Sequence, residues 1–370
     1  MDFNYSEEQQ MLFDSVGRFG LERFPASDRL RILAGGTELA AQHWREMAEL
    51  GWLMLAMTEE QGGLGGGPIE VMALAEGMGR HLITSPYVAS CVLAPALLTD
   101  GSDAAQSVVA AIGAGETIVA AALLETDGGY DLNRVDVRAE RKDNGYALNG
   151  VKSHVEDGAD AAWFLVSART SGAGDELSGI SLFLVAHDAP GLLVRRFRSI
   201  DGHRHASLAL NNVTGAKLIG AVDEALPVIE AAVARAVCAN LSEATGSMEA
   251  VSAATLEYLK TRQQFGQPIG NFQVLQHRMV DMTIACEEAR GMTCHATLNV
   301  HLEPAEWFRA VSAGKVRVSE CGLYVGQQAV QLHGGVGFSD ELIVSHHLKR
   351  QMMLAQAFGS IDYYRMRFAA

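Results

Sequence analysis

The fold is decided by the stretch Tyr258–Met282, YLKTRQQFGQPIGNFQVLQHRMVDM, which lies between two long segments of helical periodicity. In its second half, apolar residues recur at intervals of three and four, as an amphipathic helix requires. They are Phe272, Leu275, Met279, Met282 and Cys286. The preceding residues 265–270 carry two glycines around a proline. One helix therefore ends here, and the chain turns before the next begins.

Arg262 is predicted to lie in the last turn of the first of these helices, with Gln263 and Gln264 beside it. A guanidinium pairs with two oxygen atoms at once, so Arg262 is suited to binding a diphosphate. Alternatively, Arg262 only complements the negative end of the helix dipole. The pattern alone supports both interpretations equally.

A second motif lies farther along the chain, and the two together resemble the signature of the acyl-CoA dehydrogenases. The first motif, R-x-x-F-G-x-P-I-x-x-F-Q-x-x-Q, spans Arg262–Gln276, and the second, QLHGGVGF, spans Gln331–Phe338. The resemblance covers the whole chain in order, beginning with Tyr5–Gln9. Within the family, Gly337–Glu341 and His347–Arg350 are most similar to a bacterial branch. That branch includes the small subunits of two-component enzymes such as pimeloyl-CoA dehydrogenase.

The bulk composition is that of an ordinary globular protein with more than one domain. The chain has 370 residues, of which 48% are hydrophobic and 20% are charged. A formal charge of −15 argues against nucleic acids and anionic membrane surfaces as partners. Five scattered cysteines without a CxxC pair indicate a reducing compartment and no structural metal. No signal-peptide pattern and no apolar run long enough to span a bilayer are found, so the protein is predicted to be cytoplasmic.

Residues 1–117 are predicted to be helical. Ser6 and Gln9 have the spacing of a capping box at the start of the first helix. The most glycine-rich loop, Gln61–Pro68, could be taken for a phosphate-binding loop. No strand precedes it and no Lys-Ser/Thr pair follows, so we interpret it as a connector that starts a helix at Pro68.

Residues 118–221 change to the two-residue period of strands, with a hairpin turn at Asn144–Gly145. A purely β segment between helical ones predicts a small barrel or sandwich. Residues 222–370 return to a helical pattern. This order matches the α+β multidomain fold of the acyl-CoA dehydrogenases: an N-terminal helical domain, a middle β-barrel and a C-terminal four-helix bundle.

The resemblance implies that FAD is the cofactor and lies between the barrel and the second helical domain. It implies α,β-dehydrogenation of an acyl-CoA thioester to the trans-2-enoyl-CoA, as in fatty acid β-oxidation. By motif match, Arg262 and Phe265 contact the FAD of a neighbouring subunit, and Gln331 closes over the same FAD. The full set of implied FAD contacts is Arg262, Phe265, Ile269, Phe272, Leu275, Gln331, Gly334, Gly335 and Ser360.

The resemblance also implies partners. They are the acyl-CoA substrate, electron-transfer flavoprotein as the electron acceptor, and further subunits. The assembly is expected to be a homodimer or homotetramer, or an α2β2 heterotetramer with a second acyl-CoA dehydrogenase subunit. Single arginines such as Arg204 and Arg235 could meet the phosphates of CoA or an acyl carboxylate.

The β segment departs from the family pattern. The usual Lys-x-Trp-x-Thr strand is here Lys152–Glu156, KSHVE, so His154 replaces the aromatic residue that packs against the flavin and Glu156 replaces the threonine. The usual Thr-Glu turn before a glycine is here Leu124–Gly129, LETDGG. His154 is either a functional group near the flavin or a surface histidine of a hairpin.

The catalytic base of the family is also missing from its usual places. The position of the C-terminal glutamate is Phe358, which cannot take a proton, and the alternative position on the long helix holds Ala236 and Val237. Glu243 lies seven residues from Ala236, on nearly the same helix face and among small or apolar residues. Because burial poises a carboxylate to accept a proton near neutral pH, Glu243 is the candidate base.

Alternatives to Glu243 stay open. Glu243 could instead be a structural carboxylate paired with Arg235 or another cation, and Glu125, Glu341 and Asp362 are weaker candidates for the base. Three functions therefore compete. The chain is an active FAD-dependent dehydrogenase, a subunit that completes the FAD site of a partner carrying the base, or an acyl-CoA-binding scaffold without flavin.

Overall fold

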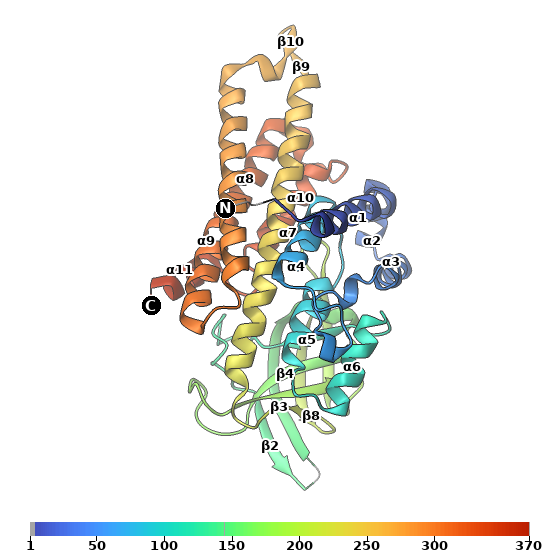
Figure 1. Cartoon of the computed structure of the whole chain (residues 1–370), viewed down its shortest axis with the longest axis vertical. Helices are drawn as coiled ribbons and strands as arrows, with labels where there is room; N and C mark the ends of the chain where they lie inside the picture. The colour runs from blue at the N-terminus through green and yellow to red at the C-terminus, as the bar shows by residue number, and fades with distance from the viewer. Residues whose placement is uncertain (1–3, 144, 370) are drawn as a thin grey trace. The chain divides into compact units, whose positions relative to one another are not determined.

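The computed structural model describes residues 4–143 and 145–369 (Figure 1). The helices are α1 (Glu7–Arg23), α2 (Ala26–Leu33), α3 (Thr37–Glu49), α4 (Pro68–Arg80), α5 (Ala94–Leu97), α6 (Asp103–Gly113), α7 (Ala225–Thr261), α8 (Gln273–Asn299), α9 (Pro304–His333), α10 (Ile343–Leu354) and α11 (Ile361–Ala369). The strands are β1 (Val119–Ala122), β2 (Arg138–Lys142), β3 (Gly145–Val155), β4 (Trp163–Arg169), β5 (Ile180–Ala186), β6 (Leu192–Arg198), β7 (Arg204–Val213), β8 (Lys217–Ile219), β9 (Gln263–Gln264) and β10 (Gln267–Pro268). The predicted order of helical, β and helical segments is confirmed.

Contacts divide the chain into two compact units. The helical unit comprises residues 1–37, 68–84 and 237–370, and the β unit comprises residues 38–67 and 85–236. The segment boundaries expected from the sequence, after residues 117 and 221, stay a prediction.

In the helical unit, α8 packs along α9, α10 and α11 pack on α9, and α1 packs on α4 (Figure 1). The capping box of α1 is present, with Ser6 and Gln9 bonded reciprocally through side chain and backbone. Gly79 and Gly246 allow α4 and α7 to approach closely. A Cβ at Gly246 would lie 2.0 Å from the Glu76 carbonyl oxygen, and one at Gly79 would lie 1.9 Å from the Glu243 carbonyl oxygen.

Helix α7 is long and apolar enough to cross a membrane by length and composition alone, with 72% of its most apolar window buried in the fold. The expectation that no run reaches this length was therefore wrong. The helix is rich in alanine and valine on several faces, because neighbouring elements cover it on several sides. A long core helix meets the same criteria.

The β unit contains one sheet in the order β6-β7-β3-β2-β4-β5-β8, with β1 paired in parallel to β4. The predicted hairpin is confirmed where Lys142 pairs with Gly145, while Asn144 lies outside the described residues. The hydrophobic core of the β unit is built from apolar side chains of several strands of the sheet, including Phe164 and Phe183. Strand β7 continues through Asn211 and Asn212 to Val213, although asparagine is typical of turns.

The first strand of this hairpin is shorter than the alternating pattern in the sequence. Alternation begins at Arg134 in the sequence, but β2 begins at Arg138. The backbone N–H groups of Asp136 and Val137 donate to the carboxylate of Glu125 instead of to a neighbouring strand. At these residues, hydrogen bonds to a side chain therefore replace the backbone hydrogen bonds of a β-ladder. Hydrophobic periodicity cannot reveal this replacement.

Candidate functional site

The first motif forms a hairpin between α7 and α8 (Figure 1). Helix α7 ends at Thr261, so Arg262 directly follows the helix rather than lying in its last turn. Strands β9 and β10 pair across a turn in which Phe265 has φ 52° and Gly266 has φ 78°. Two successive positive φ values are typical of a tight hairpin turn. The turn leaves 91% of Phe265 exposed, with its ring 6.1 Å from that of Phe272.

The second motif lies beside the first in the helical unit. Helix α9 ends at His333, and a short 3-10 turn, Gly334–Phe338, follows. The ring of Tyr258, four residues before Arg262, stacks on that of His333 with centroids 4.2 Å apart. This stack joins the end of α7 to the end of α9. The fold therefore brings the two motifs together, although about 70 residues separate them.

All residues predicted to bind FAD reach solvent in part. Arg262, Phe265, Gln331, Gly334 and Gly335 are exposed, and the other four are half-buried. A Cβ at Gly334 or Gly335 would meet open space, so the main chain there is accessible. An exposed guanidinium, accessible backbone and two exposed aromatic rings, Phe265 and Phe338, fit the phosphates and planar rings of a dinucleotide cofactor.

Ser360 has an additional structural role. Its hydroxyl accepts a hydrogen bond of 3.2 Å from the backbone N–H of Tyr363, at the start of α11. The preceding Phe358 has φ 57°, and its carbonyl accepts from the hydroxyl of Tyr364. Buried Lys315 donates to the carbonyl of Ala357 over 2.8 Å. These hydrogen bonds hold the turn in which the resemblance implies a catalytic glutamate, and Phe358 occupies that position.

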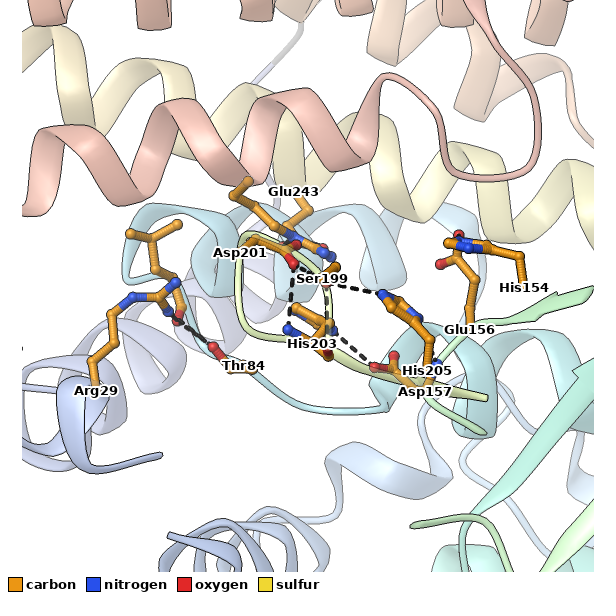
Figure 2. Close-up of polar contacts among 12 residues, drawn as sticks. Arg29, Thr84, His154, Glu156, Asp157, Ser199, Asp201, His203, His205 and Glu243 are labelled. Atoms are coloured by element: carbon orange, nitrogen blue, oxygen red, sulfur yellow. Dashed lines mark hydrogen bonds and ion pairs between the residues drawn. The ribbon is translucent and has the colours of Figure 1, made fainter. Parts of the chain in front are cut away.

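Glu243 lies buried on α7 (Figure 2). It pairs with Arg350 on α10. Two parallel hydrogen bonds join them, of 2.6 Å from Arg350 Nε to Glu243 Oε1 and 2.7 Å from Nη2 to Oε2. This bidentate geometry fits the alternative in which Glu243 is a structural carboxylate paired with a cation. The cation is Arg350 and not Arg235, which is exposed. A catalytic role for Glu243 stays a prediction.

The weaker candidates for the base are engaged or exposed. Glu125 pairs with fully buried Lys152, with Nζ and Oε1 2.6 Å apart. Burial lowers the pKa of the Lys152 ammonium to about 8, despite the opposing charge of Glu125. Asp362 is exposed and pairs with Arg365 at 2.9 Å, and Glu341 is exposed. The sequence showed both Glu125 and Lys152 but not that they meet inside the β unit.

His154 stands at an irregularity of strand β3. The register of β3 against β7 shifts between Lys152 and Val155, and His154 adopts φ 46°. A bulge of this kind re-aims a side chain. The His154 ring stacks on that of His205 at 4.9 Å and lies 6.0 Å from Phe197 on β6. His154 lies on a hairpin strand with its side chain 40% exposed, and both alternatives, a functional group near the flavin and a surface histidine of a hairpin, stay predictions.

Further polar groups surround His205 (Figure 2). His203 Nδ1 lies 2.9 Å from Asp157 Oδ1, and His205 Nε2 lies 3.0 Å from the Ser199 hydroxyl, which donates to Asp201. Sequence reasoning missed this cluster. Its only signal was the run Asp201–His205, DGHRH, which leads into strand β7.

Family models match nearly the whole chain in three consecutive parts. Residues 6–116 match the acyl-CoA dehydrogenase N-terminal domain, residues 120–213 the middle domain, and residues 226–370 the C-terminal domain. The chain belongs to the acyl-CoA dehydrogenase family. It therefore has the family's fold of helical, β and helical domains, and it is an oxidoreductase of the type that dehydrogenates acyl thioesters.

Individual relatives extend over the full length of this acyl-CoA dehydrogenase. The chain is 26% identical to the probable acyl-CoA dehydrogenase YngJ of Bacillus subtilis, over 100% of this chain and 99% of that protein. The ChsE4–ChsE5 complex from Mycobacterium tuberculosis contains a chain that is 27% identical, with a TM-score of 0.88 over 100% of this chain and 98% of that one. A structure of PigA with FAD and proline is 25% identical, with a TM-score of 0.88 over 100% and 98%. The narrower resemblance to pimeloyl-CoA dehydrogenase stays a prediction.

Proposed function

We propose that this acyl-CoA dehydrogenase uses FAD to convert an acyl-CoA thioester into the trans-2-enoyl-CoA, as one subunit of a heteromeric enzyme. The observation that carries the proposal is the joining of both motifs by the Tyr258–His333 stack, with Arg262 and the Gly334 backbone accessible beside it. The related PigA structure contains FAD, which supports the choice of cofactor. FAD, when bound, accepts the hydrogen that leaves the β-carbon as hydride.

The residues of the helical unit would hold the cofactor as follows. Arg262 would pair with the diphosphate, and Phe265 would cover the adenine end, of an FAD carried by a neighbouring subunit. Gln331 and the accessible main chain at Gly334–Gly335 would close over the same cofactor. Ile269, Phe272 and Leu275 support the hairpin, since all three are half-buried around it. Because these residues face a neighbour's cofactor, the smallest active assembly is a dimer.

Two observations support a heteromeric assembly. Phe358 leaves the usual base position without an acid, and Glu243 is held by two hydrogen bonds from Arg350. The related ChsE4–ChsE5 structure is a complex of two different proteins. The alternative is that this chain only completes the FAD site of a partner that carries the base.

Location, pathway and electron acceptor complete the proposal. We place the enzyme in the cytoplasm, where a reducing environment suits its five free, buried cysteines. We propose a role in fatty acid β-oxidation or related lipid metabolism, with electron-transfer flavoprotein as the electron acceptor.

An anaerobic absorbance titration tests this function. The purified chain, loaded with FAD, is mixed with acyl-CoAs of different chain length while the oxidised flavin band is followed. Bleaching by one class of acyl-CoA supports a complete site in this chain. Bound flavin that bleaches only after a second subunit is added supports the site-completing alternative. A chain that never retains FAD, alone or with that subunit, contradicts the proposal.

A matched pair of variants tests the binding residues. Arg262→Gln removes the guanidinium of the first motif, and Arg195→Gln removes an exposed guanidinium on β6 of the β unit. We expect Arg262→Gln to weaken FAD binding at least tenfold, because a charge-assisted bidentate contact is lost. Arg195→Gln is expected to retain FAD. Equal FAD retention by both variants would contradict the assignment of Arg262.

A further inference from the structure

The β unit contains a cleft between helices α3 and α6 (Figure 1). Both helices end at the cleft, since Glu49 is the last residue of α3, Gly113 is the last residue of α6, and both residues line it. Its volume is about 570 Å³. Sites for small molecules typically have volumes of about 300–1,000 Å³, so the cleft has the size of a ligand site.

Small side chains on both helices keep the cleft open. Ala48 of α3 and Ala110 of α6 line it and fill little space. Gly113 lies against the turn that follows α3, because a Cβ at this position would lie 2.8 Å from Met54 Cγ. A larger residue at any of these three positions would take up part of the cleft.

Two methionines give the cleft an apolar surface. Met57 is buried and Met54 is half-buried. Gln61 beside them is fixed, since its Nε2 donates to the carbonyl oxygens of Pro95 over 2.9 Å and Leu98 over 3.1 Å. Methionine adapts to apolar groups of different shape, and its sulfur makes favourable contacts with aromatic rings. The cleft therefore suits an apolar side chain, and an aromatic one in particular.

Two opposite charges, Arg45 and Glu49, line the cleft from α3. Both residues are exposed, and neither side chain has a hydrogen bond or an ion pair within the part of the chain that the structure describes. They are four residues apart, but a cation that precedes an acid by one turn is in the less favourable order for pairing on a helix. Both charges are therefore available to a ligand.

The two charges select different groups of that ligand. The guanidinium of Arg45 is suited to a carboxylate, which it binds through two oxygen atoms at once. The carboxylate of Glu49 is suited to an ammonium group. The C-terminal ends of α3 and α6 carry the negative ends of two helix dipoles, which favour a cation at the same place.

We propose that this cleft binds an α-amino acid with a large apolar side chain. The α-carboxylate pairs with Arg45, the α-ammonium pairs with Glu49, and the side chain lies on Met54 and Met57. No covalent bond is formed or broken. The site goes beyond the proposed function, because it requires neither FAD nor an acyl thioester, and its test is independent of the flavin titration.

The first test locates the ligand by NMR of the methionine methyl groups in the purified full chain. The resonances of Met54 and Met57 are assigned from Met54→Leu and Met57→Leu, and L-phenylalanine is the probe. We expect both resonances to shift along a saturable curve. Phenylpropionate lacks the ammonium group and phenethylamine lacks the carboxylate, so each should bind at least about fivefold more weakly. Absence of a shift at both methionines, or equal binding of all three compounds, would overturn the inference.

The second test uses variants that carry single changes in charge. Arg45→Gln and Glu49→Gln should each weaken binding of L-phenylalanine at least about tenfold, because each removes a charge-assisted contact. Glu60→Gln is the matched control, since Glu60 is exposed beside Gln61 but does not line the cleft. It should bind as wild type does. Wild-type affinity in Arg45→Gln or Glu49→Gln would contradict the assignment of that charge and overturn the inference.

Discussion

Replacing Glu243 by glutamine separates a structural role from a catalytic one in a single variant. The Glu243 and Arg350 side chains are only 8% and 12% exposed and share two hydrogen bonds. Removing one charge leaves a buried guanidinium without its carboxylate, and breaking such a pair costs about 3 kcal/mol. We therefore expect Glu243→Gln to lower the free energy of unfolding by about this amount. Because Arg350 ties Glu243 down, flavin reduction by acyl-CoA in the remaining folded protein should fall less than tenfold.

The assay combines urea unfolding with anaerobic stopped-flow reduction at a temperature at which the variant is folded. Glu257→Gln is the control on the same helix, since Glu257 pairs with Lys260 at the surface. Its cost should be below about 1 kcal/mol. A Glu243→Gln protein of unchanged stability, with reduction slowed by a factor of about 100 or more, would refute the structural account. That result would make Glu243 the base.

Three further predictions concern other parts of the molecule. Burial lowers the pKa of His347 to about 3, and its Nδ1 lies 2.8 Å from the Ser247 hydroxyl. His347 therefore contributes stability that is fully present above pH 6.5 and lost as pH falls towards 3. Between pH 7 and pH 5, the free energy of unfolding measured in urea should fall by about 2 kcal/mol, and this fall should disappear in His347→Gln. Equal pH dependence of both proteins would contradict the prediction. Gly246→Ala should lower the free energy of unfolding in urea by about 1–3 kcal/mol, because its Cβ would lie 2.0 Å from the Glu76 carbonyl oxygen. An unchanged free energy of unfolding would refute the close helix crossing. Phe265→Ala should change the free energy of unfolding by less than about 0.5 kcal/mol, since the ring is 91% exposed. The variant should nevertheless bind less FAD and form a smaller assembly in gel filtration. Full retention of both would argue against a role of Phe265 in binding FAD.

Much of the fold follows from local sequence features. The capping box at Ser6, the helix start at Pro68 and the hairpin turn ending at Gly145 each depend on a few adjacent residues. The amphipathic helix after Phe272 follows from its apolar spacing. These features are encoded within one or two turns of chain, so sequence patterns are sufficient to predict them.

The side-chain partners were not predictable in this way. Arg350 lies 107 residues from Glu243, and Lys152 lies 27 residues from Glu125. Both pairs form only after helices or strands have packed, and no local pattern states which cation meets which carboxylate. The motif residues could be placed from the sequence because they adjoin glycines and a proline that fix the local backbone.

The histidine cluster shows the same limit. His154 is predictable as a departure from the family strand, but its contact with His205 depends on the register shift in β3 and its pairing with β7. A bulge has no reliable signature in a single sequence. The tautomer of His205 depends in turn on one backbone N–H, that of Asp157.

The proposed function requires that this chain dehydrogenates an acyl-CoA thioester. Mass analysis of the thioester after incubation with the FAD-loaded protein and an artificial electron acceptor tests it most directly. We expect one class of acyl-CoA to lose two hydrogens and become the trans-2-enoyl-CoA. A protein saturated with FAD that leaves every acyl-CoA unchanged, both alone and with its partner subunit, would contradict it.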